Sequence, residues 1–518
     1  MSARAGWAAA AGAVVAVVVG VNLAPALVGV FYDDGIYLAL ARSLAEGRGY
    51  HLLFLPGAPA AVHYPFLYPL FLAALWKLDP SFPANVGLLR GANAVLLGVF
   101  AALLVGYLDG RLAGRTWRLA LLVAAATTVL PLVTVASVLF SEPLFLVFCV
   151  GACWAGDVAR GAEGRGRAGA LAAVAGLLAG AAALTRSVGV VAVLAVPLSL
   201  ALARRPRAAT IALAVGAACL APWLAWVARH HAGVDPALVA GYGTYTDLLA
   251  QAGWSAVSLA SIGDALRPLA AVALAPLHGW LRAFFGVPAL AVLAAGFGPL
   301  LRRAPALAWS LAGYVVVVLL WPVGPDRFLW AAWPLLAVTF AAGAEALAAR
   351  AAADRSMAGT VGRWGVAATA VAVVAGFAFF QVRGYTRGDA TRLQRGISAT
   401  LEEVLPWVRR ATPPDAVIAG EDEALLWLYT GRRAVPSDVW RYRGRAEESL
   451  GPDSLHAWLD RSGVSYVLLT GAGSGAAPTL SQLIGRYPGY LRVARVWPGS
   501  VVAFTVDRGG AAAPGGRP

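Results

Sequence analysis

The sequence predicts a polytopic α-helical membrane protein with about 11 transmembrane helices and a C-terminal soluble α/β domain. Its 518 residues are 59% hydrophobic and 13% charged, whereas soluble domains are about 45–50% apolar and about a quarter charged. The apolar residues are gathered in runs long enough to cross a bilayer. Beyond Gln381 the composition becomes charged and mixed. A lone soluble enzyme, a disordered chain and a disulfide scaffold are therefore excluded.

The first predicted helix runs from Ala8 to Val30. Its length and the absence of a convincing cleavage site argue against a removed signal peptide. Ten further spans are predicted, at Val86–Leu108, Leu119–Leu139, Pro143–Val158, Ala168–Leu184, Val188–Ala203, Ala208–Ala228, Trp280–Leu301, Pro305–Trp321, Phe328–Ala349 and Val361–Gln381.

Loop charge supports this register. The net charge is +14, and the arginines recur in every second loop, as the positive-inside rule predicts for cytoplasmic loops. We therefore expect a multi-pass protein of the inner (plasma) membrane, with a cytoplasmic N-terminus and a periplasmic or extracellular C-terminal domain. No nucleic-acid partner is expected. The loop arginines are Arg111, Arg115, Arg118, Arg160, Arg165, Arg167, Arg204, Arg205, Arg207, Arg302, Arg303, Arg350, Arg355 and Arg363.

One apolar segment, Tyr64–Leu78, does not fit as a span, because counting it would invert every later loop. It is interpreted as a short helix at the membrane interface. A twelfth span remains the alternative.

Three regions follow from these boundaries. Residues 1–381 form the transmembrane domain, with its first outer loop at 31–85, residues 382–507 form the outer α/β domain, and 508–518 form a disordered tail. In the second region helix-like stretches alternate with strand-like runs. The predicted strands are Ala416–Gly420, Tyr466–Thr470, Tyr490–Trp497 and Val501–Val506, and the predicted helices are Thr391–Arg410, Glu421–Tyr429, Ser454–Arg461 and Thr479–Arg486.

The stretch FYDDGIYLALARSLAEGRGY (residues 31–50) carries the strongest functional signal. Two adjacent carboxylates at a membrane surface are costly to desolvate, so they usually have a function. The residues after Asp34 have the period of an amphipathic helix lying along the membrane, which would hold Asp33 and Asp34 over a cavity. One aspartate, most simply Asp34, could instead cap this helix.

An acidic pair directly after the first span, followed by HYPFLYPLFLAALWKL (63–78), resembles the GT-C glycosyltransferases. The similarity is to the bacterial branch related to protein O-mannosyltransferases and lipid A aminoarabinose transferases, a glycosyltransferase family 39-like group. Further motifs in the same order are SEPLF at 141–145, LTRSVGV at 184–190 and DRFLWAAWPLLAV at 326–338.

This resemblance implies inverting transfer of a sugar from a polyprenyl-phosphate donor to an acceptor hydroxyl. Asp33 would be the general base, and Asp34 would position the acceptor or a metal. The departing phosphate needs positive charge, for which Arg327 and Arg186 are the candidates. The alternative for Arg327 is a structural pair with Asp326 or an interfacial anchor.

Three further residues are candidates for the acceptor or donor pocket, namely Glu142, His63 and Tyr64. Glu142 could simply be a first-turn acid stabilised by the helix dipole, with Ser141 as its N-cap. His63 could be a solvated loop residue.

Other interpretations remain open. No cofactor is certain, metal ligands are unknown, and a divalent metal ion is retained as a candidate. The acceptor could be a glycan, a lipid or a protein hydroxyl, and the bilayer is itself a partner. A transporter or flippase of lipid-linked saccharides would depend on polar residues deep in the spans. A non-catalytic envelope-assembly scaffold would depend on its C-terminal domain.

Overall fold

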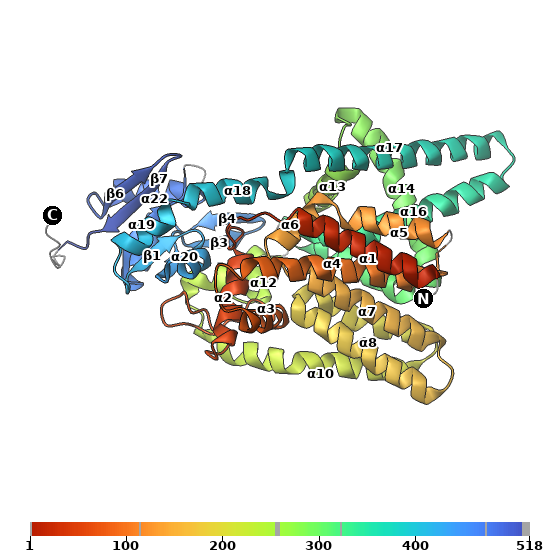
Figure 1. The fold of residues 1–518 in the computed structure, drawn as a ribbon, viewed down its shortest axis with the longest axis horizontal. Helices are drawn as coiled ribbons and strands as arrows, with labels where there is room; N and C mark the ends of the chain where they lie inside the picture. The colour runs from red at the N-terminus through yellow and green to blue at the C-terminus, as the bar shows by residue number, and fades with distance from the viewer. Residues whose placement is uncertain (1–2, 113–114, 254–258, 322–323, 472–473, 510–518) are drawn as a thin grey trace.

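The computed structural model describes residues 3–112, 115–253, 259–321, 324–471 and 474–509. The helices lie side by side in an elongated bundle, with a small sheet domain at one end (Figure 1). The N-terminus lies at the opposite end of the bundle from that domain.

Each of the eleven predicted spans contains a helix. In the described ranges eight helices are long and apolar enough to cross a membrane, or up to nine if a pair bent by 58° is one span. The helices in the eleven predicted spans are α1 (Ala3–Val21), α4 (Val86–Leu108), the bent pair α5 (Thr116–Thr127) and α6 (Leu130–Ser137), α7 (Glu142–Gly161), α8 (Arg165–Thr185), α9 (Val190–Leu202), α10 (Pro206–His230), α14 (Gly279–Arg303), α15 (Pro305–Leu320), α16 (Asp326–Ala353) and α17 (Met357–Arg387). Of these, α9 and α15 are shorter apolar helices and are not among the eight or nine.

The first span was predicted too long. Helix α1 ends at Val21, nine residues before the expected Val30. Pro25 follows, and proline disfavours helical backbone both at itself and at the residue before it. Residues 22–32 therefore leave the helix as an irregular segment that leads to the acidic pair.

Small residues let α1 and α4 pack closely. A Cβ added at Gly12 would lie 2.7 Å from the Gly98 carbonyl oxygen, and one at Gly98 would lie 2.6 Å from that of Gly12. Without a hydrophobic driving force between helices in lipid, such backbone contact is a main source of helix association. This contact fixes the direction in which the chain leaves α1.

Two short helices lie at the end of the bundle that carries the sheet domain, α2 (Asp33–Ala45) and α3 (Leu67–Leu78) (Figure 1). Helix α3 has 12 residues, about 18 Å at 1.5 Å per residue, and is too short for a hydrocarbon core of about 30 Å. The second long connection contains α11 (Val239–Tyr242), α12 (Tyr245–Ala252) and α13 (Leu259–Ala273), with 3-10 turns η2 (His231–Gly233) and η3 (Pro236–Leu238) before them. A third turn, η1 (Ser187–Gly189), joins α8 to α9.

The C-terminal region is an α/β domain built on a five-stranded sheet of order β2-β1-β5-β7-β6. Strand β1 runs parallel to β2 and β5, whereas β7 is antiparallel to both its neighbours. The strands are β1 (Val417–Gly420), β2 (Arg433–Pro436), β5 (Val464–Leu469), β6 (Leu491–Trp497) and β7 (Val501–Val506), with a separate hairpin of β3 (Trp440–Arg443) and β4 (Ala446–Ser449). The helices are α18 (Asp389–Leu401), α19 (Val404–Ala411), α20 (Glu423–Thr430), α21 (Pro452–Arg461) and α22 (Ala477–Arg486).

All four predicted strands are present, but β2 and the β3–β4 hairpin were not predicted. The helix predicted at Thr391–Arg410 is divided between α18 and α19. Helix α17 continues to Arg387, past the expected boundary at 381. Most of the expected tail, residues 510–518, lies outside the described residues.

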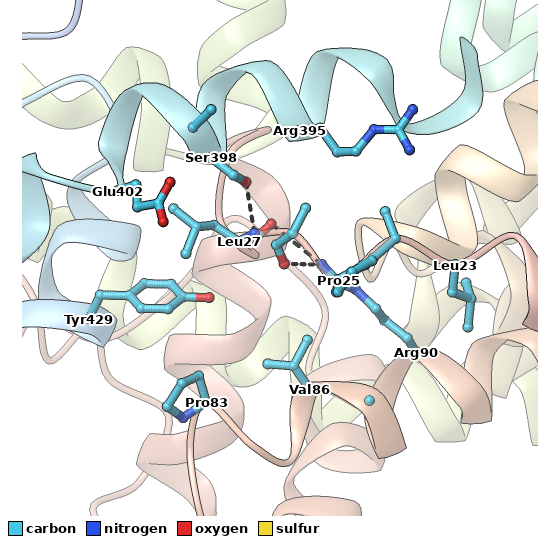
Figure 2. A pocket seen from close by; sticks show the side chains of 14 residues that line it. Leu23, Pro25, Leu27, Pro83, Val86, Arg90, Arg395, Ser398, Glu402 and Tyr429 are labelled. Carbon is cyan, nitrogen blue, oxygen red and sulfur yellow. Dashed lines mark hydrogen bonds between the residues drawn. The ribbon is translucent and has the colours of Figure 1, made fainter. Parts of the chain in front are cut away.

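The C-terminal domain holds the irregular segment that follows α1 (Figure 2). Ser398 of α18 accepts a hydrogen bond from the Leu27 backbone N–H at 2.8 Å, and the Gln394 side-chain amide donates to the Leu27 carbonyl at 2.8 Å. Tyr429 of α20 accepts from the Val28 N–H at 3.2 Å. The end of the chain therefore positions the segment that carries the acidic pair.

Arg90 of α4 supports the same segment from the bundle side. Its side chain is buried, with 4% exposed. The guanidinium donates to the carbonyls of Ala24 and Ala26 at 2.6 and 2.7 Å and to that of Ser137 at 2.6 Å. Arg90 thus ties the segment after α1 to the end of α6.

Candidate active site

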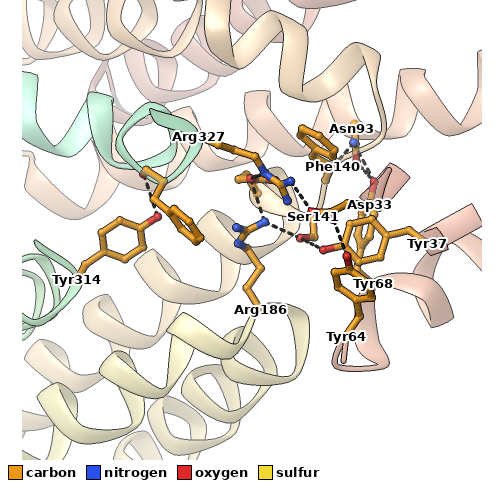
Figure 3. A network of polar contacts seen from close by, with 12 residues as sticks. Asp33, Tyr37, Tyr64, Tyr68, Asn93, Phe140, Ser141, Arg186, Tyr314 and Arg327 are labelled. Atoms are coloured by element: carbon orange, nitrogen blue, oxygen red, sulfur yellow. Dashed lines mark hydrogen bonds and ion pairs between the residues drawn. The ribbon is translucent and has the colours of Figure 1, made fainter. Parts of the chain in front are cut away.

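The site is centred on a chain of charges that joins three distant parts of the sequence (Figure 3). Arg327, in the first turn of α16, forms an ion pair with Asp33 at the start of α2. The same guanidinium donates through Nε to Glu142, the first residue of α7, at 2.7 Å. It also lies over the Phe140 ring, 3.7 Å from the ring centre. Arg327 therefore bridges two carboxylates while an aromatic face fixes its plane.

Arg186, directly after α8, completes the cluster. It contacts Glu142 at 2.9 Å and donates to the Ser141 hydroxyl at 3.0 Å. Both Arg186 and Glu142 are buried. Glu142 Oε2 and Arg186 Nε have no hydrogen-bond partner there, although buried polar atoms are nearly always paired. Arg186 Nε is thus an unsatisfied donor close to a second guanidinium, which suits an anionic group, whereas Glu142 Oε2 is an acceptor that suits a proton donor.

Tyrosines from α2 and the segment before α3 enclose the carboxylates. The Tyr64 hydroxyl donates to Asp33 at 2.5 Å. Tyr37 packs edge-on against Tyr64 and Tyr68, and its hydroxyl lies 3.3 Å from that of Ser141. Asn93 of α4 in turn donates to the Tyr68 hydroxyl at 3.0 Å. Hydrogen bonds and ring packing therefore restrict the position of Asp33 from one side.

Strained backbone precedes both acidic segments. Tyr32, immediately before Asp33, has φ of 65°, and Leu139, shortly before Glu142, has φ of 59°. Residues with a side chain rarely adopt this left-handed region, and such strain gathers at functional sites. At both places the reversed turn directs the following residues into the cluster.

Asp33 is an ionised carboxylate in this setting. Burial opposes its ionisation, but the charge of Arg327 and the hydrogen bond from Tyr64 outweigh burial, so its pKa lies below the ordinary value. Asp33 is therefore deprotonated at neutral pH and can accept a proton once its partners move.

His63 lies next to this group. Its Nδ1 is 2.6 Å from the Gly243 carbonyl oxygen, which makes Nδ1 the protonated nitrogen. Its ring packs against Tyr64 and Tyr245. Burial lowers the pKa of His63 despite that hydrogen bond and the nearby Asp33. A neutral imidazole is therefore favoured at the site.

Asp34 does not join the cluster. It is fully buried and accepts hydrogen bonds from the backbone N–H groups of Gly29 and Phe31 at 2.6 and 3.0 Å. Burial raises its pKa to about 6. The expected role of positioning an acceptor or a metal thus has no contact to support it. Asp34 instead stabilises the strained segment in front of Asp33.

Two cavities meet at the Asp33–Arg327 pair. Arg327 lines one of about 720 Å³, termed the apolar groove, with Phe31, Phe140, Trp330 and Phe380. Asp33 lines another of about 700 Å³, termed the polar cavity, which it shares with His63, Tyr64 and residues of the C-terminal domain. A group held by Arg327 and a group held by Asp33 can therefore approach from different sides.

The structure brings together six of the seven candidate residues, namely Asp33, Glu142, Arg186, Arg327, His63 and Tyr64. Arg327 pairs with Asp33 and Glu142, so the alternative of a structural pair with Asp326 is replaced by longer-range contacts. Sequence reasoning missed Tyr37 and Arg90. A signal existed for Arg90, since an arginine near the outer end of a predicted span violates the positive-inside rule in the same way as Arg186.

No group of three or more His, Cys, Asp or Glu side chains that could hold a metal occurs in the described part of the chain. The two carboxylates of the cluster are occupied by arginine. These residues do not fit a metal centre.

No protein-family model matches the chain, and no curated protein sequence matches it. Solved structures do match. Apo ArnT from Cupriavidus metallidurans is similar with a TM-score of 0.58 and 13% identity, over 97% of this chain and 98% of ArnT. The same protein bound to undecaprenyl phosphate gives a TM-score of 0.53 and 12% identity, over 96% and 98%. The Archaeoglobus fulgidus oligosaccharyltransferase, solved with zinc and sulfate, gives 0.55 and 15%, over 96% of this chain and 73% of that one.

The chain has the GT-C fold. The resemblance predicted from the sequence motifs is thereby confirmed at the level of the fold, along nearly the whole chain. Asp33 of the charged cluster begins α2, at the end of the bundle that carries the C-terminal domain (Figure 1), and shares the polar cavity with residues of that domain.

Proposed function

We propose that the protein is a membrane glycosyltransferase that moves a sugar from a polyprenyl-phosphate donor to an acceptor hydroxyl. Asp33 is the general base, and Arg327 with Arg186 binds the donor phosphate. The observation that carries the proposal is the position of the Asp33–Arg327 pair, one partner lining the polar cavity and the other the apolar groove. The bound undecaprenyl phosphate of structurally similar ArnT supports the donor class.

Two cavities along the same helices provide room for a polyprenyl chain, and the apolar groove is the first of them. A third cavity of about 830 Å³, the mid-bundle groove, lies further along the same helices. On α16, Arg327 and Trp330 line the apolar groove, and Trp333, one turn further, lines the mid-bundle groove. On α17, Phe380 lines the apolar groove and Phe377 lines the mid-bundle groove. These residues are one turn apart on one helix face, so the lipid can extend away from Arg327.

The ion pair suggests how donor binding prepares the base. A phosphate entering the apolar groove competes with Asp33 for the fork of Arg327, which suits phosphate as well as carboxylate. Asp33 then loses the charge that holds its pKa low, and its basicity rises. Glu142 and Phe140 also contact Arg327, so the arginine has partners that can hold it in place once Asp33 is released.

The reaction is a single displacement. Asp33 removes the proton from the acceptor hydroxyl, whose oxygen attacks the anomeric carbon of the donor. The bond from that carbon to the phosphate oxygen breaks, and polyprenyl phosphate leaves with its added charge on Arg327 and Arg186. One displacement inverts the anomeric centre. Stabilising charge that develops on a leaving group is commonly the largest catalytic contribution.

The same geometry disfavours a transporter. The buried charges in the described ranges lie at helix ends, as in Glu142 at the start of α7 and Arg186 after α8. A substrate path through the bundle would need polar groups near its middle. We propose a location in the inner (plasma) membrane, with the site and the C-terminal domain on the periplasmic or extracellular face.

The test uses proteoliposomes and a panel of radiolabelled polyprenyl-phosphate sugars, with a cell extract as acceptor. We expect the native protein to release polyprenyl phosphate from one donor. Asp33→Asn should lower that rate by about 10²–10⁴, the usual contribution of a general base. Asp109→Asn is the matched control, because Asp109 pairs with Arg4 beyond the other end of α4. An Asp33→Asn rate equal to that of the control would refute the proposal, and labelled lipid crossing the bilayer without release would favour a flippase.

A further inference from the structure

The polar cavity is built largely by the C-terminal domain. Asp33, His63 and Tyr64 lie on its bundle side, and the segment Ala237–Tyr242 forms one wall. The remaining wall comes from the turns after β1 and β2, the β3–β4 hairpin and the start of α22. A molecule in this cavity therefore touches both the proposed base and the soluble domain.

The charged side chains that line the polar cavity, among the described residues, are acidic. Carboxylates of Glu421, Asp438 and Glu447 line the cavity together with Asp33, and Glu423 adds a further carboxyl group. Among the described residues that line it there is no lysine or arginine. An anionic group would enter against this charge, in a confined space where such repulsion is strong.

Two buried residues of the wall each have one unsatisfied oxygen atom, although the other carboxyl oxygen of Glu423 accepts a hydrogen bond from Tyr242. Glu423 and Ser437 are 1% and 2% exposed, and both line the cavity. Glu423 Oε2 and Ser437 Oγ have no hydrogen-bond partner in the structure. Leaving such atoms unsatisfied costs free energy, and a ligand with hydroxyl groups would satisfy both.

The other lining groups suit the same ligand. Trp440, Tyr442 and Tyr242 supply aromatic surface, while Ser449 and Thr479 supply hydroxyls that already bond to Asp438 or to each other. Burial raises the pKa of Glu423 to about 8. A protonated Glu423 can donate as well as accept, as a hydroxyl-rich ligand requires.

We infer that the polar cavity binds the acceptor and that the acceptor end seated there is an uncharged, polyhydroxylated sugar rather than a phosphate or a carboxylate. The acceptor role rests on the proposed function. The preference for an uncharged ligand rests on the cavity itself. Specificity of this kind comes as much from repelling the wrong ligand as from binding the right one.

The experiment measures binding without donor, so that it is independent of transfer. Full-length protein in nanodiscs is titrated into four fluorescent disaccharides. They differ only at the exocyclic C6 of the terminal ring, which is present as a hydroxymethyl group, a carboxylate, a phosphorylated hydroxymethyl group or an aminomethyl group. Fluorescence polarisation gives each Kd. We expect the hydroxymethyl sugar to bind at least ten-fold more tightly than the carboxylate and phosphate sugars.

Two variants locate the binding. Glu423→Ala should raise the Kd of the hydroxymethyl sugar at least ten-fold. Glu423→Gln keeps a donor and an acceptor, so its Kd should stay within about three-fold of the native value. Glu448→Ala is the matched control, because Glu448 pairs with Arg441 and Arg443 and does not line the cavity. If Glu423→Ala fails to fold, the ligand series on the native protein still decides the question.

Several results would overturn the inference. They are equal or tighter binding of the carboxylate or phosphate sugar, ten-fold tighter binding of the aminomethyl sugar, or no binding of any sugar. If the native protein transfers no sugar in the donor assay but still shows the sugar selectivity, only the proposed function is refuted.

Discussion

Asp33 and Arg327 are 294 residues apart in the sequence and form an ion pair at the junction of two cavities. Each side chain has a further partner, Tyr64 for Asp33 and Glu142 for Arg327. The pair therefore belongs to a connected network, in which removal of one member changes the charge and position of the others.

Replacement of Arg327 tests how it binds phosphate and tunes Asp33. Arg327→Lys keeps the charge but loses the two-pronged fork, so kcat/KM should fall about 10–100-fold, roughly 1.4–2.8 kcal/mol of transition-state stabilisation. Arg327→Met removes the charge that lowers the pKa of Asp33. The acid limb of its residual pH–rate profile should therefore move to higher pH. An unmoved acid limb would show that Arg327 does not tune the base.

Glu142 is predicted to be essential for stability. It lies between Arg186 and Arg327, and Glu142→Gln would leave a buried arginine without its carboxylate. Breaking a buried pair in this way costs about 3–5 kcal/mol, which thermal unfolding in nanodiscs would detect. The exposed Glu163 gives the control Glu163→Gln, for which no change is expected. Equal melting temperatures for the two variants would contradict the pairing.

Arg90 is predicted to order the segment before Asp33. Arg90→Met removes donors from the carbonyls of Ala24, Ala26 and Ser137, at roughly 1–3 kcal/mol for each buried group left unsatisfied. Amide hydrogen exchange in residues 22–32 should accelerate, and transfer activity should fall although Arg90 lines no part of the polar cavity. The exposed Arg118 supplies the control Arg118→Met. Unchanged exchange in this segment would show that Arg90 does not order it.

Stability should fall as pH rises, because Glu423 and Asp422 of the C-terminal domain have raised pKa values. Burial brings them to about 8 and about 7, from 4.5 and 3.8. The folded protein then holds protons that the unfolded chain releases, so this contribution is complete below about pH 4 and is lost as pH rises through about 8. The melting temperature should drop between pH 6 and pH 8.5, and less so in Glu423→Gln. Equal drops in the two proteins would contradict the assignment to Glu423.

The lipid path predicts an effect that depends on donor length. Ala341 lines the mid-bundle groove, 14 residues beyond Arg327 and so about 21 Å along α16. Ala341→Trp should fill part of this groove and so raise KM for a long polyprenyl donor about ten-fold. The KM for a two-isoprene donor should not change. Val371→Trp, at an exposed position of α17 outside both grooves, is the control. An equal effect on both donors would place the lipid elsewhere.

The transmembrane helices could be predicted because apolar composition alone marks them, as in Val86–Leu108, where prediction and helix coincide. Helix α1 was overextended because Val28 and Val30 are apolar, yet they pack within the protein. The β3–β4 hairpin was missed because Trp440–Arg443 has only four residues and its partner strand Ala446–Ser449 lacks an apolar alternation. Its register depends on cross-strand pairing, which one sequence does not display.

In the site, too, some features could be predicted from the sequence and others could not. Asp33, Arg186 and Glu142 were recognisable because charge at the end of an apolar span is costly. The contacts among the site residues could not be predicted, since Arg327 reaches Glu142 across 185 residues and Asp33 across 294. Asp34 and Asp33 look alike in the sequence, and only the fold separates the carboxylate that holds backbone amides from the one that faces a cavity.

The contacts of Ser398 and Tyr429 with Leu27 and Val28 have a consequence for biosynthesis. The segment in front of Asp33 is made early, but the residues that hold it are translated some 370 residues later. A nascent chain that has inserted every membrane helix still lacks the groups that shape its first loop. The segment in front of Asp33 therefore gains its final contacts only after the C-terminal domain has been synthesised and has docked on it.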